Sequence, residues 1–572
     1  MSVVSARLDR LPAAAAGAAS RTLWLVFFAA LATGLLFWGA GAAAGSLATG
    51  VAALWLFAAA AVAIALVLPF SYALVSPLYV GLVGWLVDML PLVMLVGWAT
   101  LVARWAFGLW RERRLPRGGR WLWLPVFLVA WTCTGVLVIT GADFKHFLLL
   151  VAIQVLSSGV LLVVVDTMRD LESRLRLVTG LVGFVVALTV GVFIEYVGAP
   201  VQELQQEEVS TRVEEAYGVD AFPNNLEMIK YGLSQKAGAR EFRARMERFA
   251  RSNPQTPQHE VYLPPFRAFE NHLVVRFAGS ARPIEGELDR NGVDLVYDNL
   301  GLTAANTVPR WRSFARNSLT YAGVCVAIFP LALYLAWATE GRRRLLGRLG
   351  VASCLAGAGF SLSRGAWVAI LIGVLYLVVD GVMTWRRKGL TVAIYVVAAV
   401  LLTGVYLIRY GVDPLNARAL GTGSINTRAT LYEDTVESIT GTHILFGFGT
   451  ERPRSEAGSH FANRYFPRAG THSTYLNFLF RLGVPGGIAI VGIYLIAGLH
   501  ARAASRVRRG DERLFATLIA AAVASVGAHA VILNLFVEPI YTLSVSMVLA
   551  LATVIAVDLG ASVLPWRTRR AQ

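Results

Sequence analysis

The sequence predicts an all-α integral membrane protein with about fourteen transmembrane helices and two extracytoplasmic segments. Hydrophobic residues make up 56% of the 572-residue chain, and 53 glycines add to them. Charged residues make up only 15%, where about 25% is usual for soluble domains. So few charges cannot cover the surface of a water-soluble globule of this length. The composition therefore excludes a cytosolic enzyme, a secreted disulfide scaffold and a disordered chain.

The transmembrane helices are predicted from apolar runs, most of them close to the twenty residues that a membrane span needs. Only Asp88 and Pro91 divide the third run from the fourth. The predicted spans are 23–43, 47–67, 72–88, 90–110, 121–140, 146–165, 177–197, 314–337, 349–363, 365–383, 389–408, 475–499, 513–535 and 540–560.

The net charge of +16 comes from short basic clusters between these runs, whereas residues 201–312 hold 16 acidic and 14 basic side chains. Basic clusters at the ends of spans mark cytoplasmic loops, so the charge predicts topology and no nucleic-acid partner. With both termini in the cytoplasm, fourteen crossings place every cluster on the cytoplasmic side. The clusters are Arg111/Arg113/Arg114/Arg117/Arg120, Arg342/Arg343/Arg344/Arg348, Arg386/Arg387/Lys388, Arg506/Arg508/Arg509 and Arg567/Arg569/Arg570.

The alternation of cytoplasmic and periplasmic loops between successive spans divides the chain into five regions. Residues 209–217 and 241–251 have helical periodicity, which favours a mostly helical inserted domain. No internal repeat of the kind found in many secondary transporters is evident. The regions are an N-terminal transmembrane bundle (1–197), an extracytoplasmic inserted domain (198–312), transmembrane helices (313–408), a second extracytoplasmic loop (409–474), and C-terminal transmembrane helices with a cytoplasmic tail (475–572).

One polar motif precedes the second extracytoplasmic loop, and another lies within it. The first is Ser361-Leu362-Ser363-Arg364-Gly365, a short hairpin between two apolar runs. An arginine at this depth is expensive, so Arg364 either serves as an interfacial anchor or faces an anion. The second motif combines Arg428 with the later Gly447-Phe448-Gly449, where two glycines suggest a tight backbone turn near a ligand or another helix. Taken alone, this second motif is more often an ordinary surface loop than a functional site.

The third motif begins at His472-Ser473, where the second loop enters the next span. Nine residues separate this pair from Gly483, and two more separate Gly483 from Gly486. A lone histidine in such a position is more often structural than functional. The spacing that follows it is what favours a functional role.

The three motifs, in this order, resemble the signature of the O-antigen ligase and O-antigen polymerase superfamily of bacterial envelope proteins. The resemblance covers roughly residues 314–535 and implies a polytopic, GT-C-like membrane glycosyltransferase of the inner membrane. Such proteins transfer a glycan from undecaprenyl diphosphate to an acceptor hydroxyl at the periplasmic face. The resemblance assigns catalysis to Arg364, Arg428 and His472, and makes 409–474 the catalytic loop. The inserted domain at 198–312 departs from the family pattern.

The chemistry of these side chains agrees with that assignment. Arginine binds phosphate oxygens bidentately and stays charged, so Arg364 and Arg428 are expected to hold the donor diphosphate. A histidine with a pKa near neutrality can accept the proton of the acceptor hydroxyl, which is the role expected of His472. No metal-ligand cluster is evident in the outer loops, and we expect no metal and no cofactor. Supporting roles are expected for Ser363, Gly447, Gly449, Ser473, Gly483, Gly486 and Glu538.

Several alternatives stay open at this point. The acceptor is another lipid-linked glycan in a polymerase and the lipid A core in a ligase, and the inserted domain favours a polymerase slightly. A lipid-linked oligosaccharide flippase would also have about fourteen spans, but it would carry its charged residues in a central cavity. A non-catalytic envelope scaffold would leave the histidine and arginines unexplained. Membrane lipids and other polysaccharide-assembly proteins are the further partners expected.

Overall fold

The computed structural model describes residues 47–84, 90–117, 122–139, 144–198, 260–262, 272–276, 284–288, 293–296, 318–410, 432–433, 435–449, 473–535 and 538–557. Within these residues, eight helices are long and apolar enough to cross a membrane, and several shorter apolar helices accompany them. The predicted all-α polytopic membrane architecture is thereby confirmed for the membrane part. Each predicted span from 47–67 onward contains a helix, whereas 23–43 lies outside the described residues.

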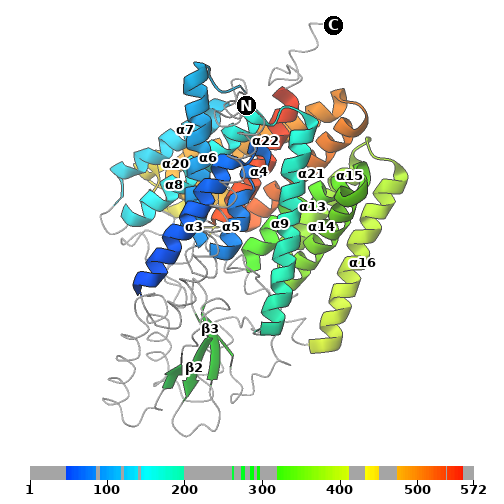
Figure 1. The fold of residues 1–572 in the computed structure, drawn as a ribbon, viewed down its shortest axis with the longest axis horizontal. Helices are drawn as coiled ribbons and strands as arrows, with labels where there is room; N and C mark the ends of the chain where they lie inside the picture. The colour runs from blue at the N-terminus through cyan, green and yellow to red at the C-terminus, as the bar shows by residue number, and fades with distance from the viewer. Residues whose placement is uncertain are drawn as a thin grey trace, which may run out of the picture.

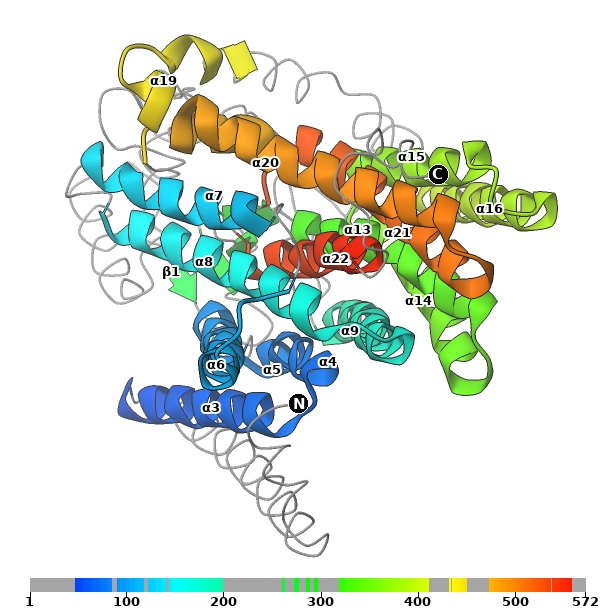
Figure 2. The same ribbon diagram turned by 90° about the horizontal axis from the view of Figure 1, so that it is seen from above.

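The N-terminal half forms two groups of helices (Figures 1 and 2). Helices α3, α5 and α6 pack against one another, while α8 packs against α22 from the other end of the chain. The bounds are α3 Leu47–Val67, α4 Phe70–Ala73, α5 Ser76–Gly84, α6 Leu90–Glu112, α7 Trp123–Cys133, the 3₁₀ helix η3 Thr134–Leu137, α8 Phe144–Thr167 and α9 Leu171–Gly198.

The C-terminal half supplies the centre of the bundle. Helices α13 and α22 are the most buried of the candidate spans, and α13 packs against α9, α14, α15, α21 and α22 (Figure 2). Gly347 has no Cβ, which lets α14 approach the backbone of α13 closely at Leu335 and Ala336. The bounds are α13 Ser318–Ala338, α14 Gly341–Phe360, α15 Arg364–Val379, α16 Trp385–Tyr410, α19 His443–Phe446, α20 Thr474–Val507, α21 Gly510–Ile532 and α22 Pro539–Val557.

Three predicted spans differ from the helices observed. The run 72–88 is divided between α4 and α5 by a turn at residues 74–75. The span predicted at 349–363 belongs to a helix that begins earlier, at Gly341, and carries an arginine cluster in its first turns. The span predicted at 475–499 is interrupted at Gly483, where the backbone leaves the helical conformation with φ 67° and ψ −170°.

Where the structure describes them, the arginine clusters gather at one end of the bundle, called here the arginine end. Arg120 and the cluster Arg567/Arg569/Arg570 lie outside the described residues. Arg114, just after α6, makes a bidentate ion pair with Asp166 of α8, at 2.8 and 2.9 Å. The hydrogen bond to this buried carboxylate raises the pKa of Arg114 above its ordinary value, so the pair stays charged at physiological pH. Arg343 of α14 pairs with Glu172 of α9 in the same region. The opposite end, where α9, α14, α16 and α21 end, is called the loop end.

The described part of the inserted segment is a four-stranded antiparallel sheet. Its strands are β1 Glu260–Tyr262, β2 His272–Arg276, β3 Ile284–Leu288 and β4 Val293–Val296, paired in chain order (Figure 1). The register places Glu260 opposite Arg276, His272 opposite Glu287, and Glu285 opposite Val296. The sequence analysis did not anticipate this sheet. The helical stretches that it expected at 209–217 and 241–251 lie outside the described residues.

Candidate active site

The Ser-Leu-Ser-Arg hairpin joins α14 to α15 at the loop end. Ser361 and Ser363 are buried, and the Ser363 hydroxyl caps α15 by accepting a hydrogen bond from Ala366 N at 3.3 Å. Leu362 takes a left-handed conformation with φ 48°, which tightens the turn. Arg364 follows as the first residue of α15, and its side chain is exposed. The hairpin therefore presents the guanidinium on the surface of the loop end.

The C-terminal end of α21 is the point at which the predicted site segments meet. The last carbonyls of a helix lack partners within that helix and need donors from elsewhere. Here the donors are hydroxyls from separate segments: Tyr432 bonds to Val531 O at 3.1 Å, and Thr474 bonds to Leu533 O at 2.9 Å. Ser473 Oγ makes a longer contact of 3.5 Å with Ala530 O.

The start of α15 reaches the same place. A Cβ on Gly365 would lie only 3.2 Å from Ile532 Cγ2, so the residue after Arg364 packs on the end of α21. His472 and Arg428 lie outside the described residues. Their chain neighbours do not: Ser473 adjoins His472, and Tyr432 follows Arg428 by four positions. The end of α21 thus contacts a residue next to Arg364, one next to His472 and one four positions after Arg428 in the sequence.

Ser473 has a local structural function as the N-cap of α20. Its Oγ accepts from Leu476 N at 3.5 Å, and its carbonyl accepts from Asn477 N at 2.8 Å. These bonds fix the point at which α20 begins. Ser473 is only 3% exposed, and Thr474 beside it is fully buried.

The glycine motifs bring the Gly-Phe-Gly turn into contact with the first half of α20. Because α20 breaks at Gly483, the carbonyls of the preceding turn are free to accept outside bonds. Phe448 N bonds to Phe480 O at 2.9 Å, and Gly449 N bonds to Arg481 O at 3.0 Å. Trp131 Nε1 of α7 bonds to Leu482 O at 2.9 Å. The Gly-Phe-Gly turn and α7 together complete the C-terminal end of this half-helix, residues 474–482.

Only glycine fits where the segment that ends in the Gly-Phe-Gly turn contacts the end of the half-helix 474–482. Gly447 has φ 63° and ψ −156°, and a Cβ there would collide with the backbone of Arg481 and Leu482. Gly483 has φ 67°, and its Cβ would collide with the carbonyls of Ile444 and Leu445. Both conformations are essentially restricted to glycine. These glycines therefore pack against another element of the protein.

Gly449 and Gly486 make the neighbouring contacts. A Cβ on Gly449 would lie 2.9 Å from Gly135 O of η3, and one on Gly486 would collide with the Leu482 side chain across the break. The spacing of the third motif now has a physical reason. Ser473 caps a half-helix of nine residues, Gly483 breaks it, and Gly486 lets the second half of α20 begin close to the first.

Glu538 lies at the start of α22 and is half-buried. Its backbone N–H donates to Leu535 O at 2.9 Å, and its carbonyl accepts from Thr542 N at 2.9 Å. The backbone of Glu538 thus forms the turn between the α21 end and α22. Among the described residues, no group of three or more His, Cys, Asp or Glu is placed to hold a metal ion.

The sequence analysis missed a polar stripe along the half-helix 474–482. Thr474, Asn477 and Arg481 recur at helical spacing and are at most 2% exposed. Among the described residues, neither Nδ2 nor Oδ1 of Asn477 has a hydrogen-bond partner. Arg481 lies beside Phe478, with its guanidinium carbon 5.4 Å from the ring centroid. An asparagine and an arginine within a run of large apolar side chains were the available signal.

Residues 349–491 match the Wzy_C family model, described as O-antigen ligase. The match covers about a quarter of the chain, from α14 into the second half of α20, and includes Arg364, Arg428 and His472. No curated protein and no solved structure matches the chain. This match confirms the resemblance drawn from the three motifs. Residues 349–491 are thus similar to the O-antigen ligase domain, which supports the O-antigen ligase and O-antigen polymerase superfamily for this part of the chain.

Proposed function

We propose that this protein is a glycosyltransferase that moves a glycan from undecaprenyl diphosphate onto an acceptor hydroxyl at the periplasmic face of the bacterial inner membrane. The observation that carries the proposal is the convergence at the end of α21. The start of α15 with Arg364, and the segments adjoining Arg428 and His472, are all anchored there. The O-antigen ligase match covers Arg364, Arg428 and His472 and ends before α21.

The orientation follows from charge. The arginine end carries the basic clusters that face the cytoplasm in membrane proteins. The loop end, with Arg364 at its surface, then faces the periplasm, where no ATP is present. The free energy for transfer must therefore come from cleavage of the bond between the sugar and the diphosphate.

The residues divide the reaction between them as follows. The bond between sugar C1 and the diphosphate oxygen breaks, and a bond between C1 and the acceptor oxygen forms. His472 takes the hydroxyl proton, and undecaprenyl diphosphate leaves with the negative charge. Arg364 and Arg428 stabilise that charge through bidentate contacts that strengthen as the bond breaks. The N-terminus of α15, capped by Ser363, adds its positive partial charge beside Arg364.

A polymerase is favoured slightly over a ligase. The inserted segment at 198–312 follows α9 at the loop end, where it can border a path for a growing chain. The test is the product that accumulates in a deletion strain. If the protein is a polymerase, its deletion leaves lipopolysaccharide capped with a single repeat, or abolishes a secreted polymer. If the protein is a ligase, its deletion instead leaves full-length chains on undecaprenyl diphosphate. A strain with unchanged envelope glycans would contradict both.

A further inference from the structure

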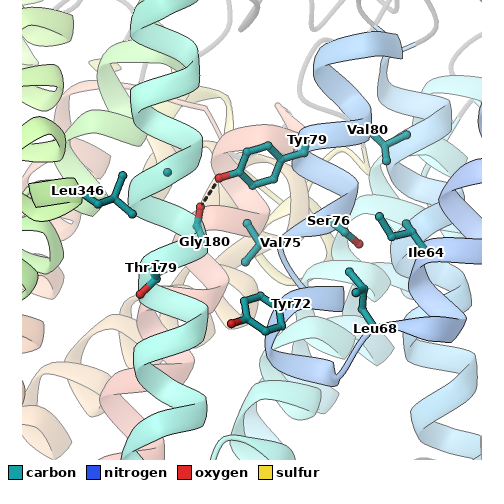
Figure 3. A pocket seen from close by; sticks show the side chains of 11 residues that line it. Ile64, Leu68, Tyr72, Val75, Ser76, Tyr79, Val80, Thr179, Gly180 and Leu346 are labelled. Atoms are coloured by element: carbon teal, nitrogen blue, oxygen red, sulfur yellow. Dashed lines mark hydrogen bonds between the residues drawn. The ribbon is translucent and has the colours of Figure 1, made fainter. Parts of the chain in front are cut away.

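An open cleft lies between the N-terminal helices and α9, away from the candidate active site. It encloses about 530 Å³, within the range of small-molecule sites, which is about 300–1,000 Å³. Figure 3 shows Ile64, Leu68 and Val75 on one side and Thr179 of α9 on the other. Leu346 of α14 closes one edge.

The lining of the cleft is suited to an apolar chain. Tyr79 donates its hydroxyl hydrogen bond to Gly180 O at 2.9 Å, so this polar group is already satisfied (Figure 3). Gly180 and Gly183 line the cleft where α5 packs closely on α9, because a Cβ would lie 3.0 Å from Val75 Cγ2 at the first position and 2.6 Å from the Tyr79 hydroxyl at the second. Tyr72 is 42% exposed and Tyr79 is 37% exposed, so the cleft is open at its side.

The cleft lies in the half of the bundle nearer the arginine end. Thr179 and Gly183 are eight and twelve positions beyond the start of α9 at Leu171, which is roughly 12–18 Å at 1.5 Å per residue. Half of a hydrocarbon core about 30 Å thick is about 15 Å, so these two residues lie near the bilayer centre when α9 enters the core at Leu171. Leu346 lies five positions beyond the start of α14 at Gly341, about 7.5 Å along that helix, so the cleft runs from this depth toward the bilayer centre. The side opening of the cleft therefore meets the acyl chains of the leaflet at the arginine end.

Basic residues lie one helical turn from the lining, toward headgroup depth. Arg342 and Arg343 precede Leu346 by four and three positions, and Arg176 precedes Thr179 by three. Arg343 and Arg176 share a single carboxylate, Glu172, at 2.9 and 3.2 Å. Arg342 is exposed.

A further guanidinium lies behind the lining residue Leu68. Arg104 of α6 donates to Ala65 O and Leu68 O, the carbonyls at the end of α3, at 2.6 and 2.8 Å. Its partners are neutral, so its charge adds to the positive excess. Positive charge above an apolar cleft complements a lipid that has an anionic headgroup and an acyl tail.

We propose that this cleft binds an anionic phospholipid, such as phosphatidylglycerol, from the leaflet at the arginine end. One acyl chain occupies the cleft beside Tyr72 and Tyr79, and the phosphate is held near Arg342 and Arg343. The site is separate from the donor site at the loop end and does not depend on the proposed reaction.

Native mass spectrometry of the purified full-length protein tests the proposal, with phosphatidylglycerol or phosphatidylethanolamine added at equal concentration. The wild type should retain phosphatidylglycerol preferentially. Thr179→Phe fills the cleft and should abolish this preference. Arg342→Gln should weaken phosphatidylglycerol binding about fivefold, the effect expected of one basic residue near an anionic headgroup.

Matched controls carry the same changes on α16, away from the cleft. Val400→Phe adds a ring on an exposed apolar face, and Arg386→Gln removes an exposed arginine at the same end. Both should bind phosphatidylglycerol as the wild type does. If Thr179→Phe does not fold, phosphatidylglycerol binding by Arg342→Gln compared with that by Arg386→Gln still tests the proposal. Equal binding of both lipids by the wild type, equal losses in variant and control, or displacement of phosphatidylglycerol by equimolar undecaprenyl phosphate would overturn the proposal.

Discussion

Arg364 is the residue at which an anchoring role and a catalytic role are most sharply opposed. An interfacial anchor needs only a positive charge at the right depth, whereas a diphosphate ligand needs the planar guanidinium. Arg364→Lys should therefore impair transfer, and Arg364→Ala should also weaken donor binding by about tenfold or more, as expected for a lost charge-assisted contact. His472→Ala should leave donor affinity nearly unchanged, because the role proposed for His472 is to take the proton of the acceptor hydroxyl.

The measurement is a binding titration with a short-chain undecaprenyl-diphosphate donor analogue. Arg386→Ala, which removes an exposed arginine at the opposite end, is the control and should bind like the wild type. Wild-type affinity and turnover in both Arg364 variants would return this residue to the role of an anchor.

The half-helix 474–482 offers a matched pair of buried polar residues one turn apart. Thr474→Val removes the hydrogen bond to Leu533 O and leaves that carbonyl unsatisfied, which should lower the unfolding free energy by about 1–3 kcal/mol. Asn477→Leu removes an amide that has no partner among the described residues, so stability should stay the same or rise. Thermal unfolding in detergent measures both. A larger loss for Asn477→Leu than for Thr474→Val would contradict these contacts.

At the scale of elements, the interlock between α19, the Gly-Phe-Gly turn and the broken α20 has a direct test. Gly447→Ala meets both a left-handed backbone and a collision with the backbone of Arg481, and should destabilise the protein by at least about 3 kcal/mol. Gly441 also has a positive φ, of 56°, but nothing lies within 4 Å of its Cβ position.

Gly441→Ala therefore carries only the conformational cost, about 1–2 kcal/mol. The difference in Tm between the two variants isolates the interlock. If both variants unfold at the same temperature, the close packing of the turn on α20 is not what requires glycine at position 447.

Helix positions could be predicted from the sequence because apolar runs near twenty residues long have few alternatives in a membrane. The break at Gly483 was not predicted, because a positive φ depends on the carbonyls of Ile444 and Leu445, almost forty residues earlier in the chain. The sheet formed by β1–β4 was missed for a related reason. Strands of three to five residues leave only a weak periodic pattern, and their pairing is decided by non-local contacts.

For the candidate site, residue types and their order predicted three segments, whose catalytic roles stay a prediction, and the family match at residues 349–491 supports the superfamily. The sequence did not predict that the end of α21 joins these segments. Its contacts use backbone carbonyls at Val531 and Leu533, and a backbone carbonyl has no signature in the sequence. Tyr432 and Thr474, which donate to those carbonyls, are ordinary polar residues until the fold is known.

At the scale of the whole molecule, charge and polarity are separated along the membrane normal. The basic clusters and the Arg114–Asp166 pair lie at one end, and the hairpin with Arg364, the α21 end and the cap of α20 lie at the other. The central helices α13 and α22, between these two ends, are almost completely buried. This arrangement is what the proposed glycan transfer at one face of the membrane requires.

The most direct test of the proposed catalysis is the rate of glycan transfer by the purified protein, with an undecaprenyl-diphosphate-linked glycan as donor. Wild type and His472→Ala are compared at saturating donor, after thermal unfolding has established that both are folded. Loss of a general base typically slows a reaction about 10²–10⁴-fold, and His472→Ala should fall in that range. Transfer by His472→Ala within about threefold of the wild-type rate would contradict the assignment of His472 as the base.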